Sequence, residues 1–118
     1  MQFRQRPAFA KQLKRLKKKY RSLDIDLEQL EKVLRMKPKG VGGKHWDRLH
    51  TSSDGKVTIF KVRLSCASMR GETRFRVIYA HNESSQTVVF IDFIELYFKG
   101  DQENENRNLI AEYIREIE

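Results

Sequence analysis

Apolar residues recur at helical spacing in the first third of the chain. After a short extended start around Phe3, Pro7 suits the first position of a helix whose apolar face holds Phe9, Leu13, Leu16, Tyr20 and Leu23. A second helix can be capped by Ser22 or Asp24 and ended by Pro38 and Gly40, and its apolar stripe is Leu27, Leu30, Val33 and Leu34. Two helices joined this closely predict a helical hairpin.

The middle of the chain predicts β-strands. Runs of strand-forming residues span 57–64, 73–80 and 87–98. Residues 82–86 are typical of a hairpin turn and residues 65–72 join the first two runs, so we expect an antiparallel meander. The third run is apolar on both faces through Ile94, as in a central strand covered on both sides. The Gly-rich, polar segment 37–56 is predicted to be a long loop with a turn at Asp54 and Gly55.

A closing helix is expected near the C-terminus. Asp101 or Asn104 can cap it, and its apolar side consists of Ile110, Tyr113, Ile114 and Ile117. A length of 118 residues suits one domain, residues 1–118. The elements together predict an α+β fold, in which a small antiparallel sheet packs on an N-terminal helical hairpin and a C-terminal helix closes the structure.

Composition adds a strong positive charge to this picture. The formal net charge is +8, and residues 1–21 hold nine Lys and Arg side chains and no acidic one. Such a chain attracts polyanions, nucleic acid first and an acidic partner protein second. Cys66 is the only cysteine, which excludes a disulfide within the chain and a Cys-based metal site. Without a signal-like or membrane-length apolar run, we expect a cytoplasmic protein.

Strand alternation gathers several of these cations on one face of the sheet. Phe60, Val62 and Leu64 point one way and Lys61 and Arg63 the other, while Arg74 and Arg76 oppose Phe75, Val77 and Tyr79. Cations on an exposed sheet face are common and often only solvated. Clustered like charges repel one another unless an anion joins them, so the cluster favours a phosphate site.

Other candidate sites are weaker. The three histidines lack a metal-ligand spacing, and GVGG at 40–43 follows a helix and lacks the Lys-Ser or Lys-Thr of a phosphate loop. Trp46 is either a packing anchor or a base-stacking platform. Cys66 has no base marked beside it in the sequence. We therefore expect no metal and no cofactor.

The order of elements and several short motifs resemble the RelE/ParE toxin superfamily of prokaryotic toxin–antitoxin systems. The motifs are FAKQLKRLKKKY in the first helix, then FKVRL, GETRFRVIY and VVFIDFIELYFKGD. The resemblance implies a small twisted antiparallel sheet on a helical hairpin, with the toxic surface on the other side of the sheet. Members similar to RelE cut messenger RNA in the ribosomal A site, whereas members similar to ParE inhibit gyrase without nuclease chemistry. Both are held inactive by a cognate antitoxin.

The resemblance also implies roles for particular residues. Lys61 and Arg63 match the basic pair of the catalytic strand, Arg76 matches the arginine that faces the scissile phosphate, and Tyr97 and Lys99 fall near catalytic strand-end positions. Tyr97 either stacks on a base, transfers a proton or packs the strand end, and Glu95 is a lesser candidate for the base. Arg74 and the helix residues Lys14, Lys17 and Lys18 would add affinity for RNA.

The expected activity is a metal-independent mRNA endoribonuclease that depends on the ribosome, with a cognate antitoxin as partner and the two associating as a hetero-oligomer. Two alternatives stay open, a gyrase-inhibiting toxin and a plain RNA-binding module. The sequence departs from RelE in having Ile59 where a second lysine often stands and no histidine after Tyr97.

Overall fold

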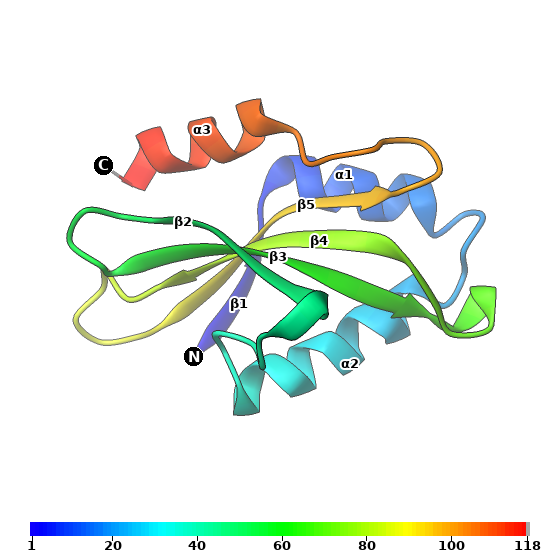
Figure 1. The fold of residues 1–118 in the computed structure, drawn as a ribbon, viewed down its shortest axis with the longest axis horizontal. Helices are drawn as coiled ribbons and strands as arrows, with labels where there is room; N and C mark the ends of the chain where they lie inside the picture. The colour runs from blue at the N-terminus through cyan, green and yellow to red at the C-terminus, as the bar shows by residue number, and fades with distance from the viewer. Residues whose placement is uncertain (118) are drawn as a thin grey trace.

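A computed structural model of the chain describes residues 1–117 and shows an α+β fold (Figure 1). The helices are α1 (Pro7–Leu16), α2 (Leu23–Met36) and α3 (Arg107–Ile117), with short 3-10 turns at Gly43–His45 and Ala67–Met69. The strands are β1 (Gln2–Gln5), β2 (Trp46–Thr51), β3 (Val57–Cys66), β4 (Glu72–Asn82) and β5 (Phe90–Phe98). The helical hairpin, the three-strand meander and the closing helix are all present.

The strands form one five-stranded sheet in the order β1-β5-β4-β3-β2. The predicted meander β3-β4-β5 is antiparallel, and β1, which was not predicted as a strand, adds a parallel pair with β5, so the sheet as a whole is mixed. Residues 2–5 were read only as an extended start, because four residues are too few for an alternating pattern. Residues 2–5 become a strand by pairing with the edge of β5, and the residues that pair are 88 positions apart in the sequence.

A second difference lies in the segment predicted to be a long loop. Residues 46–51 form the edge strand β2, which pairs with β3 from Trp46↔Val62 to Thr51↔Thr58 with a bulge after Arg48. Its side chains are only partly buried, so its hydrophobic pattern is weak. Gly40 has φ +75°, and a Cβ there would lie 2.2 Å from the Trp46 ring. Glycine at this position therefore lets the loop close over the tryptophan.

The hairpin helices begin and end at slightly different residues from those expected. α1 ends at Leu16, so Tyr20 and Leu23 are not part of it. Tyr20 instead lies in the connecting turn, where its ring packs edge-on against Phe75 with 5.0 Å between ring centres. Leu23 begins α2 and is fully buried. The apolar residues were assigned to the core correctly, although the helix was extended too far.

The sheet separates two hydrophobic cores. The first lies between the sheet and the helices α1 and α2, and it includes Phe60, Val62, Phe75, Val77 and Tyr79. The second lies between the other sheet face and α3, and it includes Ile59, Ile78, Ala80, Ile94 and Tyr97. Figure 1 shows α3 and α2 on opposite sides of the sheet. The central strand β5 contributes to both cores, as its apolar pattern indicated.

Candidate functional site

The α3 side of the sheet carries a row of polar residues beyond the end of the helix. The strand register places Arg63 of β3 opposite Arg76 of β4, and Arg76 opposite Tyr97 of β5. Residues directly opposite on one face of a sheet have neighbouring side chains. The row is positioned by a bulge in β5, because Ile78 pairs with Glu95 whereas Tyr79 pairs with Phe93. We call Arg63, Arg76 and Tyr97 the arginine row.

The two arginines of the row are not neutralised within the protein. Among residues 1–117, no carboxylate forms a salt bridge with Arg63 or Arg76. Partial burial, and next the charge of Arg63, lower the pKa of Arg76 from its ordinary value. Its Nη1 donates to the carbonyl oxygens of Thr73, at 2.7 Å, and Phe75, at 3.1 Å. The pair is therefore electrostatically unfavourable until an anion joins it.

Two residues further along the strands, on the same face, Ile78 of β4 is flanked by Lys61 of β3 and Glu95 of β5. Lys61 Nζ donates to Glu105 Oε1 at 2.9 Å, and both side chains are largely buried. Burial alone would raise the pKa of Glu105, but the hydrogen bond and charge of Lys61 bring it below the ordinary value. Lys61 and Glu105 thus form an acid–base pair beside the arginine row.

Glu95 is buried under the segment that joins β5 to α3. Its carboxylate accepts hydrogen bonds from Gln102 Nε2 and from the backbone N–H of Asn106, both at 2.8 Å. Burial raises the pKa of Glu95, and the two donors offset part of that rise. Since its oxygens are engaged by this segment, Glu95 has a clear structural role as the anchor of the segment.

Tyr97 is 3% exposed, and its ring belongs to the second core. Its hydroxyl is buried without a hydrogen-bond partner in the described part of the chain. Burial, with the nearby charges of Glu105 and Glu95, raises its pKa to about 12. In this arrangement the ring cannot stack on a base, and the hydroxyl is a neutral phenol at physiological pH.

Lys99 and Arg74 lie beyond the arginine row along the strands, near the start of β4 and just past the end of β5. The Lys99 backbone N–H donates to Arg74 O at 2.8 Å, and Lys99 Nζ donates to the carbonyl oxygen of Glu103. The Arg74 guanidinium carbon lies 5.0 Å from the centre of the Phe98 ring, which packs on the first core. The structure therefore holds Arg74 against an aromatic ring at the strand end, while Arg63 and Arg76 remain the paired cations.

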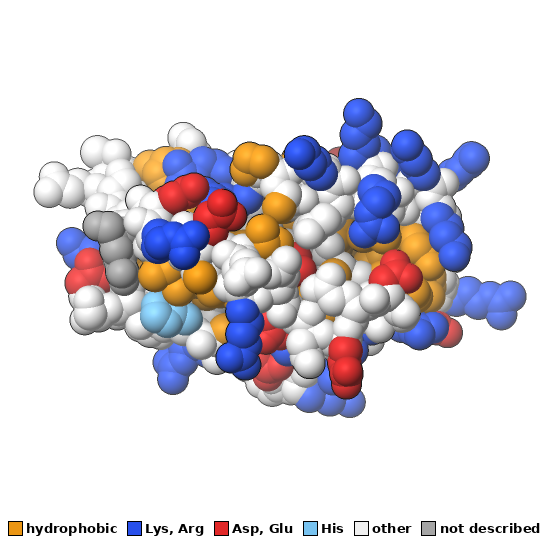
Figure 2. All heavy atoms as spheres, turned by 90° about the horizontal axis from the view of Figure 1, so that it is seen from above, with side chains coloured by type: hydrophobic (Ala, Val, Ile, Leu, Met, Phe, Trp, Pro, Cys, Tyr) orange, Lys and Arg blue, Asp and Glu red, His pale blue; other side chains and the backbone are white. Residues whose placement is uncertain are grey.

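The lysines predicted to bind RNA lie in the other layer of the molecule. Lys14 is exposed on α1, and Lys17 and Lys18 lie in the turn that follows it. Lys17 Nζ also contacts Asp24 Oδ2 at 3.4 Å. In Figure 2, Lys and Arg side chains gather at the right-hand side, over α1 and the adjoining turn. Because α1 packs on the first core, these lysines are separated from the arginine row by the sheet.

Sequence reasoning missed two residues near the start of α3, Glu105 and His50. Glu105 precedes α3 and meets Lys61 over a separation of 44 residues, for which the sequence holds no signal. His50 was treated as a loop residue, but it lies on β2 and its Nε2 is buried without a partner among the described residues. His50, Glu105 and Arg107 line a cavity of about 340 Å³ at the start of α3. Strand alternation alone would have placed His50 on the face of Trp46, and the bulge after Arg48 is what turns it to the face of Ile59.

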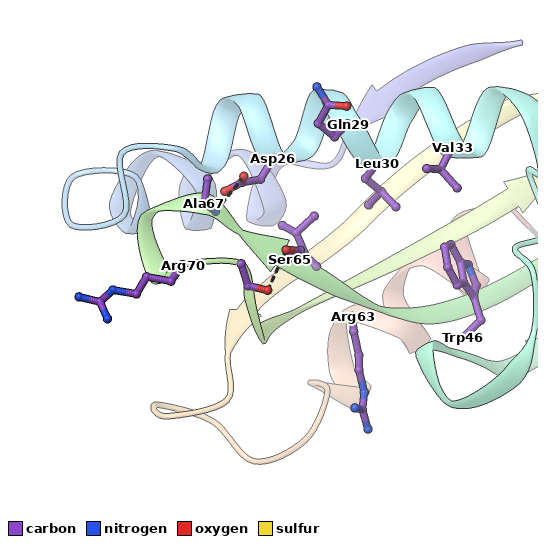
Figure 3. Close-up of a pocket in the computed structure, with 11 residues that line it drawn as sticks. Asp26, Gln29, Leu30, Val33, Trp46, Arg63, Ser65, Ala67 and Arg70 are labelled. Atoms are coloured by element: carbon purple, nitrogen blue, oxygen red, sulfur yellow. Dashed lines mark hydrogen bonds between the residues drawn. The ribbon is translucent and has the colours of Figure 1, made fainter.

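A groove of about 570 Å³ runs along the other side of β3, between that strand and α2 (Figure 3). Leu30 and Val33 of α2 and Trp46 of β2 point into the space between helix and sheet. Arg63 contributes to the lining, but its side chain points away from α2. The groove and the arginine row therefore meet at Arg63.

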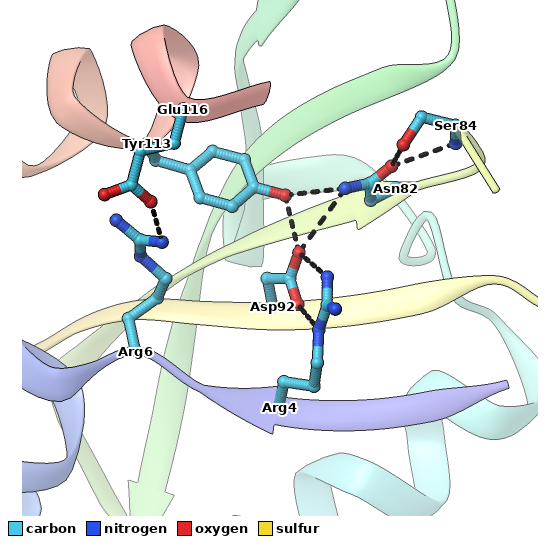
Figure 4. Close-up of polar contacts among 7 residues, drawn as sticks. All are labelled: Arg4, Arg6, Asn82, Ser84, Asp92, Tyr113 and Glu116. Carbon is cyan, nitrogen blue, oxygen red and sulfur yellow. Dashed lines mark hydrogen bonds and ion pairs between the residues drawn. The ribbon is translucent and has the colours of Figure 1, made fainter. Parts of the chain in front are cut away.

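A buried polar network occupies the opposite end of the α3 side (Figure 4). Asp92 accepts from Arg4 Nε at 2.6 Å and Arg4 Nη2 at 2.9 Å, and from the Tyr113 hydroxyl at 2.6 Å. Asn82 Nδ2 donates to the Tyr113 oxygen at 3.1 Å, and Arg6 pairs with Glu116. Burial, and next the contact with Asp92, raise the pKa of Tyr113. This network fastens α3 to the sheet.

Within residues 1–117, no group of three or more His, Cys, Asp or Glu side chains is placed to hold a metal ion. The same residues contain no helix that is both long and apolar enough to span a membrane. Comparison of the chain with protein-family models, with curated proteins and with solved structures finds no match.

Proposed function

We propose that the protein is the toxin of a type II toxin–antitoxin pair and that it cleaves messenger RNA on the ribosome. The observation that carries this proposal is the pair Arg63 and Arg76, directly opposite on adjacent strands and without a carboxylate partner among the described residues. Two forked guanidinium groups side by side suit the oxygens of a phosphate diester. The net charge of +8 favours a polyanionic substrate.

The proposed reaction uses the substrate's own 2′-hydroxyl as the nucleophile. Its oxygen attacks the adjacent phosphorus, the bond from phosphorus to the 5′ oxygen breaks, and a 2′,3′-cyclic phosphate and a 5′-hydroxyl result. Charge builds on the non-bridging phosphoryl oxygens in the transition state, and Arg63 and Arg76 stabilise it there. Charge stabilisation by preorganised groups is commonly the largest single contribution to catalysis.

The reaction also needs one group to take the 2′-hydroxyl proton and another to protonate the leaving 5′ oxygen. Lys61 and Glu105 lie in the next row and already share a hydrogen bond of 2.9 Å. In the proposal the Glu105 carboxylate accepts the first proton and the Lys61 ammonium supplies the second. Tyr97, which stays a neutral phenol at physiological pH, can donate a hydrogen bond to the phosphate once its hydroxyl is uncovered.

A cognate antitoxin is the proposed protein partner, and ribosome-bound mRNA is the proposed substrate. The exposed lysines of α1 and the following turn support this view, because they offer a second basic surface to ribosomal RNA on the layer opposite the arginine row. A basic surface on two sides suits the crowded RNA environment of a ribosomal site.

The test is controlled expression in bacteria. Wild-type protein should arrest growth, and mapping of RNA 5′ ends should show new cuts within translated messages. Arg76→Ala should abolish both effects, whereas Lys32→Ala, which removes one exposed charge from α2, should leave them intact. Retained toxicity in the double variant with Arg76 and Lys61 both changed to alanine would overturn the nuclease proposal. DNA-damage responses without message cleavage would favour a gyrase-binding toxin.

A further inference from the structure

A cavity of about 520 Å³ lies on the helix side of β2, near the turn between β2 and β3. We call it the β2 pocket. Arg48 of β2 pairs with Phe60 of β3, and Phe60 belongs to the first core, so both side chains face the helix layer. Arg63 and Arg76 face the other side of the sheet. The β2 pocket is therefore separate from the arginine row.

The lining of the β2 pocket is cationic. It contains Lys39 and Arg48 and no Asp or Glu. Among residues 1–117, neither of these two cations forms a salt bridge. Four other cavities, of about 340 to 570 Å³, each include an Asp or Glu in their lining. Two uncompensated cations around one hollow attract an anionic ligand.

The turn that borders the β2 pocket uses its own carboxylate to hold its shape. Gly55 of this turn lines the pocket, and Asp54 precedes it. Asp54 Oδ1 accepts hydrogen bonds from Ser52 Oγ at 2.7 Å and from the Lys56 backbone N–H at 3.0 Å. These contacts, the one with Ser52 first, lower the pKa of Asp54. Asp54 is thus engaged within the turn and leaves the pocket cations to a ligand.

One wall of the β2 pocket is aromatic and fixed in place. Trp46 and Phe60 form it. Trp46 Nε1 donates to the Tyr79 hydroxyl at 3.0 Å, and the Phe60 ring stacks on the Tyr79 ring with 5.3 Å between ring centres. The backbone at Gly40 closes over another part of the Trp46 ring. A preorganised aromatic wall binds a planar ring at a low cost in conformational entropy.

Two threonine hydroxyls add hydrogen-bonding groups to the β2 pocket. Thr51 and Thr58 are directly opposite on β2 and β3, and both line the pocket. A hydroxyl can donate and accept, so it suits the hydroxyls of a sugar as well as a phosphate oxygen. The volume lies in the range of pockets that hold small organic ligands. Cations, hydroxyls and an aromatic wall together match a ligand that carries a phosphate, a sugar and a planar ring.

We propose that the β2 pocket binds a nucleotide, with the phosphate at Lys39 and Arg48, the sugar beside the threonine hydroxyls and the base against Trp46. Guanidinium and ammonium groups are common partners of phosphate, and an aromatic ring stacks on any base. A free mononucleotide and one nucleotide of a single-stranded RNA offer the same chemistry. Because the pocket lies across the sheet from the arginine row, this site does not rest on the proposed function.

The experiment titrates adenosine 5′-monophosphate into the purified protein and follows the fluorescence of Trp46, the only tryptophan of the chain. We expect saturable quenching, because the base stacks on the indole. Adenosine and inorganic phosphate, each lacking one half of the contacts, should bind about tenfold more weakly or worse. Arg48→Gln should weaken nucleotide binding by about tenfold or more. Lys44→Gln is the matched control, because it removes an exposed cation outside the pocket lining and should bind as the wild type does.

A short single-stranded RNA oligonucleotide, titrated in the same way, identifies the source of the nucleotide. Quenching that depends on Arg48 and is tighter with RNA assigns the pocket to an RNA strand, and tighter binding of the mononucleotide assigns it to a free ligand. The Arg76→Ala protein should bind adenosine 5′-monophosphate as the wild type does.

Four results would overturn the nucleotide site: no saturable quenching with either ligand, equal affinities of the Arg48→Gln and Lys44→Gln proteins, loss of quenching in Arg76→Ala, or equal quenching by a polyglutamate peptide. The last result would mean that the pocket recognises negative charge alone. None of these measurements follows RNA cleavage, so their failure would leave the nuclease proposal to its own test.

Discussion

Asp92 and Arg76 lie on adjacent strands and face the same side of the sheet, yet only the charge of Asp92 is compensated by a salt bridge. Asp92 receives hydrogen bonds from Arg4 and from Tyr113 of α3, and Asp92 and Tyr113 are both buried. Arg76 has another arginine beside it and, among residues 1–117, forms no salt bridge with a carboxylate. One end of the face satisfies its polar groups internally, while at the other end two arginines and a tyrosine hydroxyl have no side-chain partner among the described residues.

The contrast extends to a pair of tyrosines. The hydroxyls of Tyr113 and Tyr97 are both buried, and burial raises both pKa values. The Tyr113 hydroxyl donates to Asp92 and accepts from Asn82, whereas the Tyr97 hydroxyl has no partner in the described chain. A buried polar group without a partner costs stability, so the two tyrosine hydroxyls should contribute to the free energy of unfolding with opposite signs.

The largest expected effect is at the open end. Arg76→Ala should lower the rate of message cleavage in a purified translation reaction by about 10²- to 10³-fold, because it removes a donor to the developing phosphoryl charge. The free energy of unfolding in urea should change by less than about 1 kcal/mol, since the substitution also relieves repulsion from Arg63. An unfolded or fully active variant would contradict the assignment of this end to binding.

At the covered end the same kind of substitution should act on stability instead. Arg4→Met leaves the Asp92 carboxylate buried with one ionic partner removed. We expect a loss of about 2 kcal/mol in urea unfolding, below the range for fully buried pairs because half of the Arg4 side chain is exposed. Arg35→Met, at an exposed α2 position, is the matched control and should cost less than about 1 kcal/mol.

Tyr113→Phe tests the satisfied hydroxyl. It removes one donor to Asp92 and the acceptor for Asn82, so both buried groups lose a partner. The expected cost is about 1 to 3 kcal/mol, measured by thermal or urea unfolding. A variant as stable as the wild type would show that the network contributes little to holding α3.

Tyr97→Phe is the converse test and should be neutral or stabilise the protein by up to about 1 kcal/mol, because it removes a hydroxyl that has no partner. The pKa of Tyr97, raised from 10.0 to about 12, adds a pH dependence. A raised pKa in the folded state means that stability is complete below pH 10 and falls as pH rises toward about 12. The stability advantage of the variant should therefore widen over that range in alkaline unfolding curves.

The smallest expected effect is on the pair between Lys61 and Glu105. The pKa of Glu105 is lowered in the folded state, so its contribution to stability is present above the ordinary glutamate pKa and is lost as pH falls through the folded value. Glu105→Gln should cost less than about 1 kcal/mol at neutral pH and nothing in acid. An equal cost at both pH values would mean that the charge of Glu105 is not what holds Lys61.

Much of this architecture could be predicted because local patterns and the final packing agree. The alternation in 57–64 and 73–80 correctly assigned Phe60, Val62, Phe75 and Val77 to the hairpin side of the sheet. β1 and β2 were missed since each is an edge strand, and an edge strand has too little burial to impose a pattern.

The candidate site was less predictable, for physical reasons. Alternation places Arg63 and Arg76 on one face, but only the register makes them direct neighbours, and the irregular connection at 65–72 does not encode the register. The bulge at Ile94 decides that Tyr97 and Glu95 face α3, and no local signal marks it. Partners such as Glu105 for Lys61 depend on how the chain returns after β5.

The parallel pairing of β1 with β5 has a consequence for the time at which the protein becomes competent during its synthesis. β1 leaves the ribosome first and β5 is the last strand to be made, so the sheet cannot close until most of the chain has emerged. This late part of the chain supplies Tyr97 of the arginine row. It also supplies Glu105, the partner of Lys61, and Asp92, the partner of Arg4. A truncated nascent chain would thus carry the basic N-terminal segment without the arginine row complete, and the row would form only near the end of translation.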